Sequence, residues 1–155
     1  MNFSNVTELL GTFYPETQLK QFLDALGFHG KPRLPRDSTN AHLLRHDLGI
    51  EIIFTGERYL DQPMREYPEG ALVFECISFY GAKDSDFSRF DGPLPHALEF
   101  GLTLKQLSSV FGQPAFFDEE LALARWDLPQ HAVFANFDRE GCSDVYSFQT
   151  PVTDA

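Results

Sequence analysis

Two stretches of the chain carry apolar residues every three or four positions, the spacing that places side chains on one face of an α-helix. These residues are Leu19, Phe22, Leu23 and Leu26 in the first stretch and Leu104, Leu107 and Phe111 in the second. The pattern predicts helices over residues 15–26 and 103–111, each followed by a glycine that suits a helix C-terminus. A short additional helix is predicted over residues 5–10, with Asn5 as its N-cap.

After each of the two longer helices, the apolar residues alternate with polar ones, which is typical of β-strands. The predicted strands are 41–48, 50–55 and 71–80 after the first helix, and 121–128, 132–138 and 143–149 after the second. Each helix is therefore followed by a three-stranded antiparallel meander. Two such meanders side by side form a sheet of six strands with the helices packed on one face. The predicted fold class is α+β.

The same order of motifs occurs twice, which predicts an internal repeat. Residues 19–27 and 104–112 both read L-K-Q-(F/L)-x-x-x-(L/F)-G. Each is followed by Arg-x-Asp-Leu, beginning at Arg45 and at Arg125, and then by a strand of alternating apolar residues. We predict a single domain, 1–155, whose parts are a first repeat unit at about 12–80, a connector at 81–101 and a second repeat unit at about 102–150. The two helices, each with its meander, should superpose through an approximate twofold axis.

Composition and charge narrow the class of protein. Hydrophobic residues make up 43% and charged residues 23% of the chain, which is typical of a globular domain. The net charge is −11, which disfavours nucleic acid and anionic membranes as ligands. Residues 1–56 contribute a net charge of −1 and the rest of the chain −10. Because the apolar runs are short and the N-terminus does not read as a signal peptide, a cytoplasmic protein is expected.

Motifs of catalysis are missing from the sequence, which contains neither Gly-x-Ser-x-Gly nor a glycine-rich phosphate loop. His42 and His46 have the spacing of a helical metal site, but they fall in a predicted strand, where residues four apart cannot share one ion unaided. Cys76 and Cys142 lie outside any CxxC motif, so two buried, reduced thiols are expected, with a structural disulfide as the alternative. We therefore predict that the protein is not an enzyme and has no catalytic residue, cofactor or metal.

Two acidic segments are the candidate binding residues, one in the connector and one in the second repeat unit. An acidic run is usually a solvated face or a binding patch, whereas acid–base catalysis needs a carboxylate in an apolar cleft. The residues assigned to partner binding are Asp84, Asp86, Phe87, Asp118, Glu119 and Glu120. Phe87 and Phe90 are the candidates for exposed aromatics in the connector, but the role expected of both is to hold the connector across the sheet edge. Trp126 is expected in the core.

Four segments resemble the small cytosolic immunity proteins of bacterial toxin–immunity systems. They are residues 49–54, 94–103, 111–114 and 125–128. The resemblance covers about residues 40–150. It implies a protein that binds one cognate toxin or effector and blocks it, without a catalytic residue or cofactor. The unit of helix, Gly-x-Pro, Trp and meander is also similar to a small outer-membrane assembly lipoprotein, but the signal peptide and lipidated cysteine of that fold are missing from this sequence.

The acidic balance fits an inhibitor of a toxin with a basic face, because opposite charges speed association. Two alternatives remain open. The first is a small-molecule-binding or enzymatic domain that uses a cleft between the two repeats, lined by Arg45, His46 and Arg125. The second is a homodimeric structural adaptor that pairs through a sheet edge.

Overall fold

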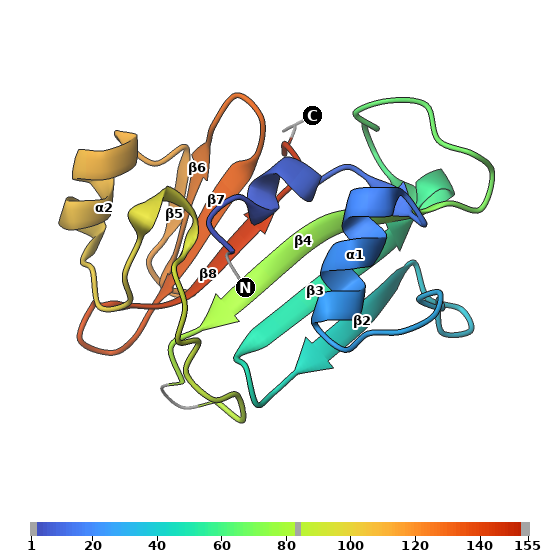
Figure 1. The fold of residues 1–155 in the computed structure, drawn as a ribbon. Coiled ribbons are helices and arrows are strands. Elements are labelled where there is room, and N and C mark those ends of the chain that lie inside the picture. The colour runs from blue at the N-terminus through green and yellow to red at the C-terminus, as the bar shows by residue number, and fades with distance from the viewer. Residues whose placement is uncertain (1–2, 83–84, 153–155) are drawn as a thin grey trace.

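The structure, a computed structural model of the 155-residue chain, describes residues 3–82 and 85–152. Its centre is one antiparallel sheet of eight strands (Figure 1). Seven strands follow the order β2-β3-β4-β8-β7-β6-β5, and β1 pairs with the first residues of β4. The strands are β1 (Phe13–Tyr14), β2 (Asn40–Arg45), β3 (Ile50–Gly56), β4 (Leu72–Tyr80), β5 (Phe116–Asp118), β6 (Leu123–Asp127), β7 (Ala132–Phe137) and β8 (Ser143–Gln149). The α+β class and the antiparallel sheet are confirmed, and β1 and β5 are additional to the six predicted strands.

Two α-helices lie where apolar spacing predicts them, α1 (Thr17–Ala25) and α2 (Leu104–Phe111). Helix α2 begins at a capping box, in which Thr103 and Gln106 each bond the other's main-chain N–H. It ends at Gly112, whose φ of +90° is readily adopted only by glycine. Helix α1 begins two residues later than predicted, because the chain up to Tyr14 is in β1.

Three short 3-10 helices complete the secondary structure of the described residues: η1 (Val6–Leu9), η2 (Glu57–Tyr59) and η3 (Pro95–Ala97). The first corresponds to the short helix predicted over residues 5–10. The prediction that Asn5 caps it is wrong, since the Asn5 side chain makes no capping hydrogen bond.

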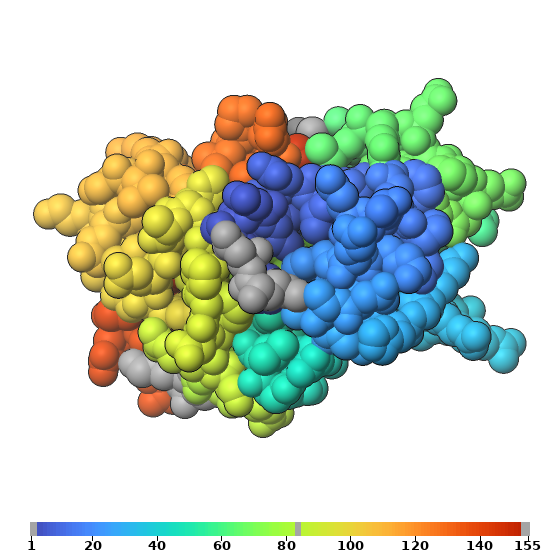
Figure 2. Space-filling model, in the orientation of Figure 1, coloured from blue at the N-terminus to red at the C-terminus, as the bar shows by residue number. Residues whose placement is uncertain are grey.

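Both α-helices pack on the same face of the sheet. The register aligns Trp126, Val133, Phe148, Ile77 and Ile52 in one row across five strands, and paired residues share a face. All five of these side chains are almost fully buried in one core that also includes buried residues of both helices. Figure 2 shows this helix face, which the N-terminal segment, α1 and the connector cover.

The connector is part of the core on the helix face. Phe90, Leu94 and Leu98 are buried, and the ring of Phe90 lies 5.1 Å from that of Phe3 and 4.7 Å from that of Phe79. Phe90 therefore holds the connector against the sheet, which is the role expected of it, and is not a surface aromatic. Pro93 and Pro95 reduce the entropy that this segment loses on ordering, because each fixes its own φ in the unfolded chain as well.

Candidate functional site

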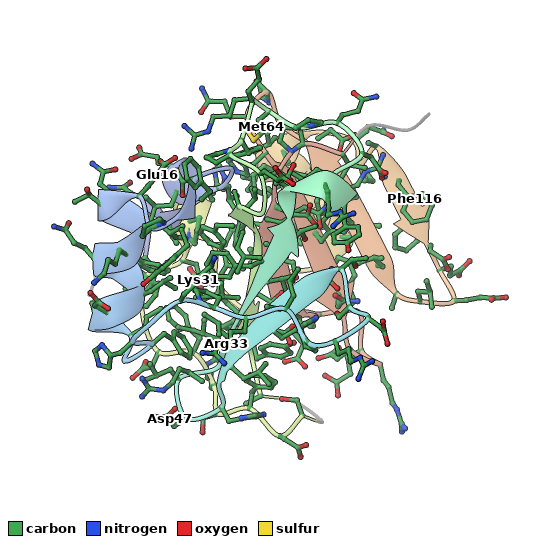
Figure 3. All side chains as sticks on the ribbon, turned by 90° about the vertical axis from the view of Figure 1, so that its right-hand side faces the viewer. Glu16, Lys31, Arg33, Asp47, Met64 and Phe116 are labelled. Atoms are coloured by element: carbon green, nitrogen blue, oxygen red, sulfur yellow. The ribbon has the colours of Figure 1, made fainter. Side chains whose placement is uncertain are left out.

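The candidate site is the face of the sheet opposite α1 and α2, here called the open face. Within residues 3–82 and 85–152, neither α-helix lies over it. Strand alternation directs His42 and Glu51, Ser78 and Ser147, and Arg125 and Phe116 to this side. Figure 3 shows α1 and Glu16 on one side of the sheet and Phe116 on the other.

The centre of the open face is polar and close-packed. The hydroxyl oxygens of Ser78 and Ser147, on the adjacent strands β4 and β8, lie 2.7 Å apart. Beside them, Cys76 is only 8% exposed, and burial raises the pKa of its thiol to about 12. A thiol with such a high pKa remains protonated at neutral pH and is a poor nucleophile. Tyr80 is similar: burial, with the nearby Glu51 carboxylate, raises its pKa to about 12.

Apolar side chains surround this polar centre. Ile53, Phe134 and Val145 are partly exposed on the open face. Leu44 is 41% exposed near one end of the sheet and Phe116 is 44% exposed near the other. The open face therefore combines apolar area with hydrogen-bonding groups, as protein-binding surfaces do.

Carboxylates dominate the charge of the open face. Glu51 lies 3.2 Å from His42, and Asp127 lies 3.0 Å from the Arg125 guanidinium. Glu75, at the bulge of β4, accepts a hydrogen bond from the Thr55 hydroxyl at 3.0 Å, and Asp118 lies in β5. The strand residues of this face thus carry four carboxylates against one arginine and one histidine.

The predicted acidic run Asp118–Glu120 begins at the last residue of β5 and continues into the turn between β5 and β6, where the Asp118 carboxylate accepts a hydrogen bond from the Leu121 N–H at 3.0 Å. This turn, with β5, is here called the acidic edge (residues 116–121). Its apolar side chains are among the most exposed of the protein, with Phe117 45% and Leu121 65% exposed. Sequence reasoning missed these apolar neighbours, although the Phe116-Phe117 pair directly precedes the acidic run.

The other predicted acidic segment lies elsewhere on the protein. Asp84 is outside the described residues, and Asp86 is exposed. Phe87 is half-buried in a stack of three rings, 3.9 Å from Tyr80 and 4.5 Å from His46 between ring centroids. Since four strand spacings separate β4 from β5, this stack lies about 19 Å from the acidic edge. The structure does not bring the two predicted segments together, and Phe87 holds the connector against the sheet.

A hollow of about 300 Å³ lies on the helix side, beside the end of α1. Its floor includes Phe3, Leu26 and Ile50, and its rim carries Asp47 and Arg89. The residues expected to line a cleft between the repeats lie elsewhere. The Arg45 guanidinium donates to the main-chain oxygen of Leu26 and pairs with Asp47 at 2.7 Å, His46 joins the Phe87 stack, and Arg125 is on the open face.

One side-chain pair was not anticipated from the sequence. The Nε2 atoms of His96, in η3, and His131, in the β6–β7 turn, lie 2.9 Å apart. Burial lowers the pKa of both imidazoles, and the neighbouring His96 charge lowers the pKa of His131 further. Among the described residues, no three His, Cys, Asp or Glu side chains are placed to hold a metal ion. Both cysteines are free, as expected, and Cys76 is buried. The expectation that Cys142 is buried as well is wrong, because its side chain is partly exposed.

Comparison with known proteins finds no relative: no family model, curated protein or solved structure matches the chain. In the described part of the chain, no helix has the length and apolar character needed to cross a membrane.

Proposed function

We propose that the protein is an immunity-type inhibitor, which binds and occludes a cognate bacterial toxin or effector in the cytoplasm. The observation that supports this proposal is the open face, where four carboxylates and partly exposed apolar side chains share one side of the sheet while both helices pack on the other. A partner that fits such a surface is a protein with a basic face.

Electrostatics supports this choice of partner. Most of the negative charge lies after residue 56, and the open face and acidic edge belong largely to that part of the chain. An acidic surface attracts a basic one over a distance set by the ionic strength, about 8 Å at 0.15 M salt. This attraction raises the association rate. An acidic inhibitor therefore reaches a basic active site quickly and keeps the substrate out.

We also propose that the sheet arose by duplication of a helix-plus-meander unit. In support, Ser78 and Ser147 face each other across the β4–β8 pair, and the strand order reads β3, β2 on one side and β7, β6 on the other. A twofold axis through this serine pair, perpendicular to the sheet, would exchange the two sets of strands. It would also leave both helices on the same face, where they lie.

The test is co-expression with the product of the neighbouring gene, the expected toxin. Reversing Asp118, Glu119 and Glu120 to Lys should slow association and weaken protection of the cells, and the rate should fall as salt rises. Folding should be retained, because Glu119 and Glu120 are exposed and the lost Asp118–Leu121 hydrogen bond contributes only about 1 kcal/mol. A matched control reverses three exposed acidic residues outside the acidic edge, Glu66, Glu69 and Glu99, and should protect like the original protein.

Three outcomes would count against the proposal. The first is a neighbouring gene product that does not bind the protein. The second is full protection by the variant reversed at Asp118–Glu120, which would move the interface elsewhere. The third is a partner whose contact surface is itself acidic, which would remove the electrostatic argument.

A further inference from the structure

The outer edge of β5 is open to strand addition. β5 is the last strand in the order of the sheet, so only one of its sides is paired. Along a strand, the main-chain N–H and C=O groups of successive residues point alternately to the two neighbouring strands. The Leu128 N–H bonds to the His131 oxygen across the β6–β7 hairpin, so Leu128 points to β7. Arg125, three residues earlier, therefore points to β5. Arg125 lies opposite Phe116, so these two residues form a hydrogen-bonded pair. The N–H and C=O of Phe117 consequently point outward, away from the sheet.

The side chains at this edge favour binding of an extended segment with apolar and positively charged residues. Phe116 and Phe117 project to opposite sides of the sheet and are 44% and 45% exposed. Asp118, Glu119 and Glu120 follow immediately, and Glu119 and Glu120 are exposed. Proteins blunt a free edge with a very short strand, charged side chains, proline or a covering segment. β5 is short, with three residues, but its charges are all negative, and its edge offers apolar groups beside an outward-facing main-chain donor and acceptor.

We propose that the acidic edge is a docking site at which an extended basic segment of the partner protein adds a strand to β5. Main-chain hydrogen bonds to Phe117 hold the segment, its apolar side chains cover Phe116 and Phe117, and its Lys or Arg side chains meet Asp118–Glu120. The proposal rests on the proposed function for the identity of the partner, and it specifies the mode of binding.

Charge distinguishes this occupant from a second copy of the chain. Two copies paired through β5 would place two acidic edges side by side, and each molecule carries a net charge of −11. The opposite edge of the sheet, β2, follows a segment that carries Lys31, Arg33 and Arg36, so a basic segment is disfavoured there. A basic strand is therefore expected at β5 and not at β2.

The test uses ¹⁵N-labelled protein and two synthetic probes, acetylated and amidated hexapeptides of alternating Lys and Val or alternating Glu and Val. The Lys peptide should shift the amide resonances of residues 115–121 in a saturable way, and the Glu peptide should not. Phe117→Ala keeps the outward N–H and should retain part of the affinity. Phe117→Pro removes that N–H without removing a β5–β6 hydrogen bond, and should bind at least about fivefold more weakly than Phe117→Ala, as expected for one lost hydrogen bond.

Equal binding of the two peptides, shifts at β2, or no shift at all would overturn the proposal. So would equal affinity of the Phe117→Ala and Phe117→Pro variants, once their amide spectra show that both are folded. Dimerisation through β5 in the absence of peptide would identify a second copy as the occupant and would also overturn it. The two hypotheses fail separately. If the Pro and Ala variants bind the partner equally well, strand addition is refuted and the inhibitor function stands. If the protein binds the Lys peptide but does not protect cells from the toxin, the inhibitor function is refuted and strand addition stands.

Discussion

Replacing Trp126 should reveal how much of the stability depends on the contact between α2 and the sheet. Trp126 is 1% exposed, its ring lies 5.6 Å from that of Phe111, and its indole N–H donates to the Gly112 oxygen at 2.8 Å. A tryptophan buries about 200 Å². At about 25 cal/mol per Å², this burial contributes up to about 5 kcal/mol.

Two substitutions separate the apolar from the polar contribution. Trp126→Ala removes the ring and should lower the free energy of unfolding by about 4 kcal/mol, within the usual range for emptying a large aromatic site. Trp126→Phe keeps most of the apolar area and loses the hydrogen bond, which contributes about 1 kcal/mol. Water can replace the indole at the Gly112 carbonyl because Gly112 is exposed. The expected loss for this variant is therefore about 1–2 kcal/mol, including the smaller ring.

Unfolding by urea should be followed by far-ultraviolet circular dichroism, because Trp126 is the only tryptophan and its fluorescence is lost in both variants. The control is Phe117→Ala, at an exposed aromatic of the acidic edge, where a change within about 0.5 kcal/mol is expected. A loss below about 1 kcal/mol for Trp126→Ala would refute the reasoning. Such a result would mean that α2 does not depend on this side chain for its position.

Two further predictions follow from titratable groups whose pKa is shifted by loss of contact with water. Burial lowers the pKa of His96 and His131 below the ordinary 6.5. Near and below that pH, the unfolded chain therefore binds more protons than the folded protein. The free energy of unfolding should consequently fall as the pH decreases from about 7.5 to 5.5. His131→Gln should flatten this slope in urea unfolding, and an unchanged slope would show that the pair does not control it. Burial raises the pKa of the Cys76 thiol to about 12. Iodoacetamide at pH 8 should therefore alkylate Cys142 in the folded protein and Cys76 only after unfolding. The number of labels is read from the intact mass, and rapid labelling of both cysteines in the folded protein would contradict the prediction.

Local signals in the sequence were sufficient for the elements that carry them. Helix α2 was predictable because Thr103, Gln106 and Gly112 mark both of its ends. The alternation of apolar and polar residues predicted six strands. β5 was not predictable from the same reasoning. It has only three residues, Phe116 and Phe117 are both exposed, and its pairing with β6 is set by the tertiary structure and not by an alternating pattern.

The candidate site was predictable only in part, for a related reason. The acidic run 118–120 stood out by its composition, whereas the open face combines residues from strands that are distant in the sequence. Phe87 and Phe90, three positions apart in one segment, pack in different places: Phe87 against Tyr80, whose side chain is on the open face, and Phe90 in the core on the helix face. Composition alone does not distinguish them, because the path of the connector past the end of the sheet decides which side each ring meets.

The register also changes how the two proposed repeat units correspond. By sequence motif, Arg45 matches Arg125, and Trp126 matches His46. In the sheet, Arg45 lies opposite Ile50, and Trp126 lies opposite Val133. Ile50 and Val133 are themselves matched as the first apolar residues of their strands. Under the proposed duplication, the structural counterpart of Trp126 is therefore Arg45, one position away from the motif alignment.

Hydrogen bonding supports this corrected correspondence. The last carbonyl groups of a helix lack partners within the helix, and both side chains supply one: Arg45 donates to the Leu26 oxygen beside α1, and Trp126 donates to the Gly112 oxygen beside α2. Their different chemistry follows from their different burial. β2 is an edge strand, where a guanidinium keeps access to water and to Asp47, whereas β6 is covered by β5 on its outer side. An interior strand favours a donor with a large apolar body, which tryptophan provides.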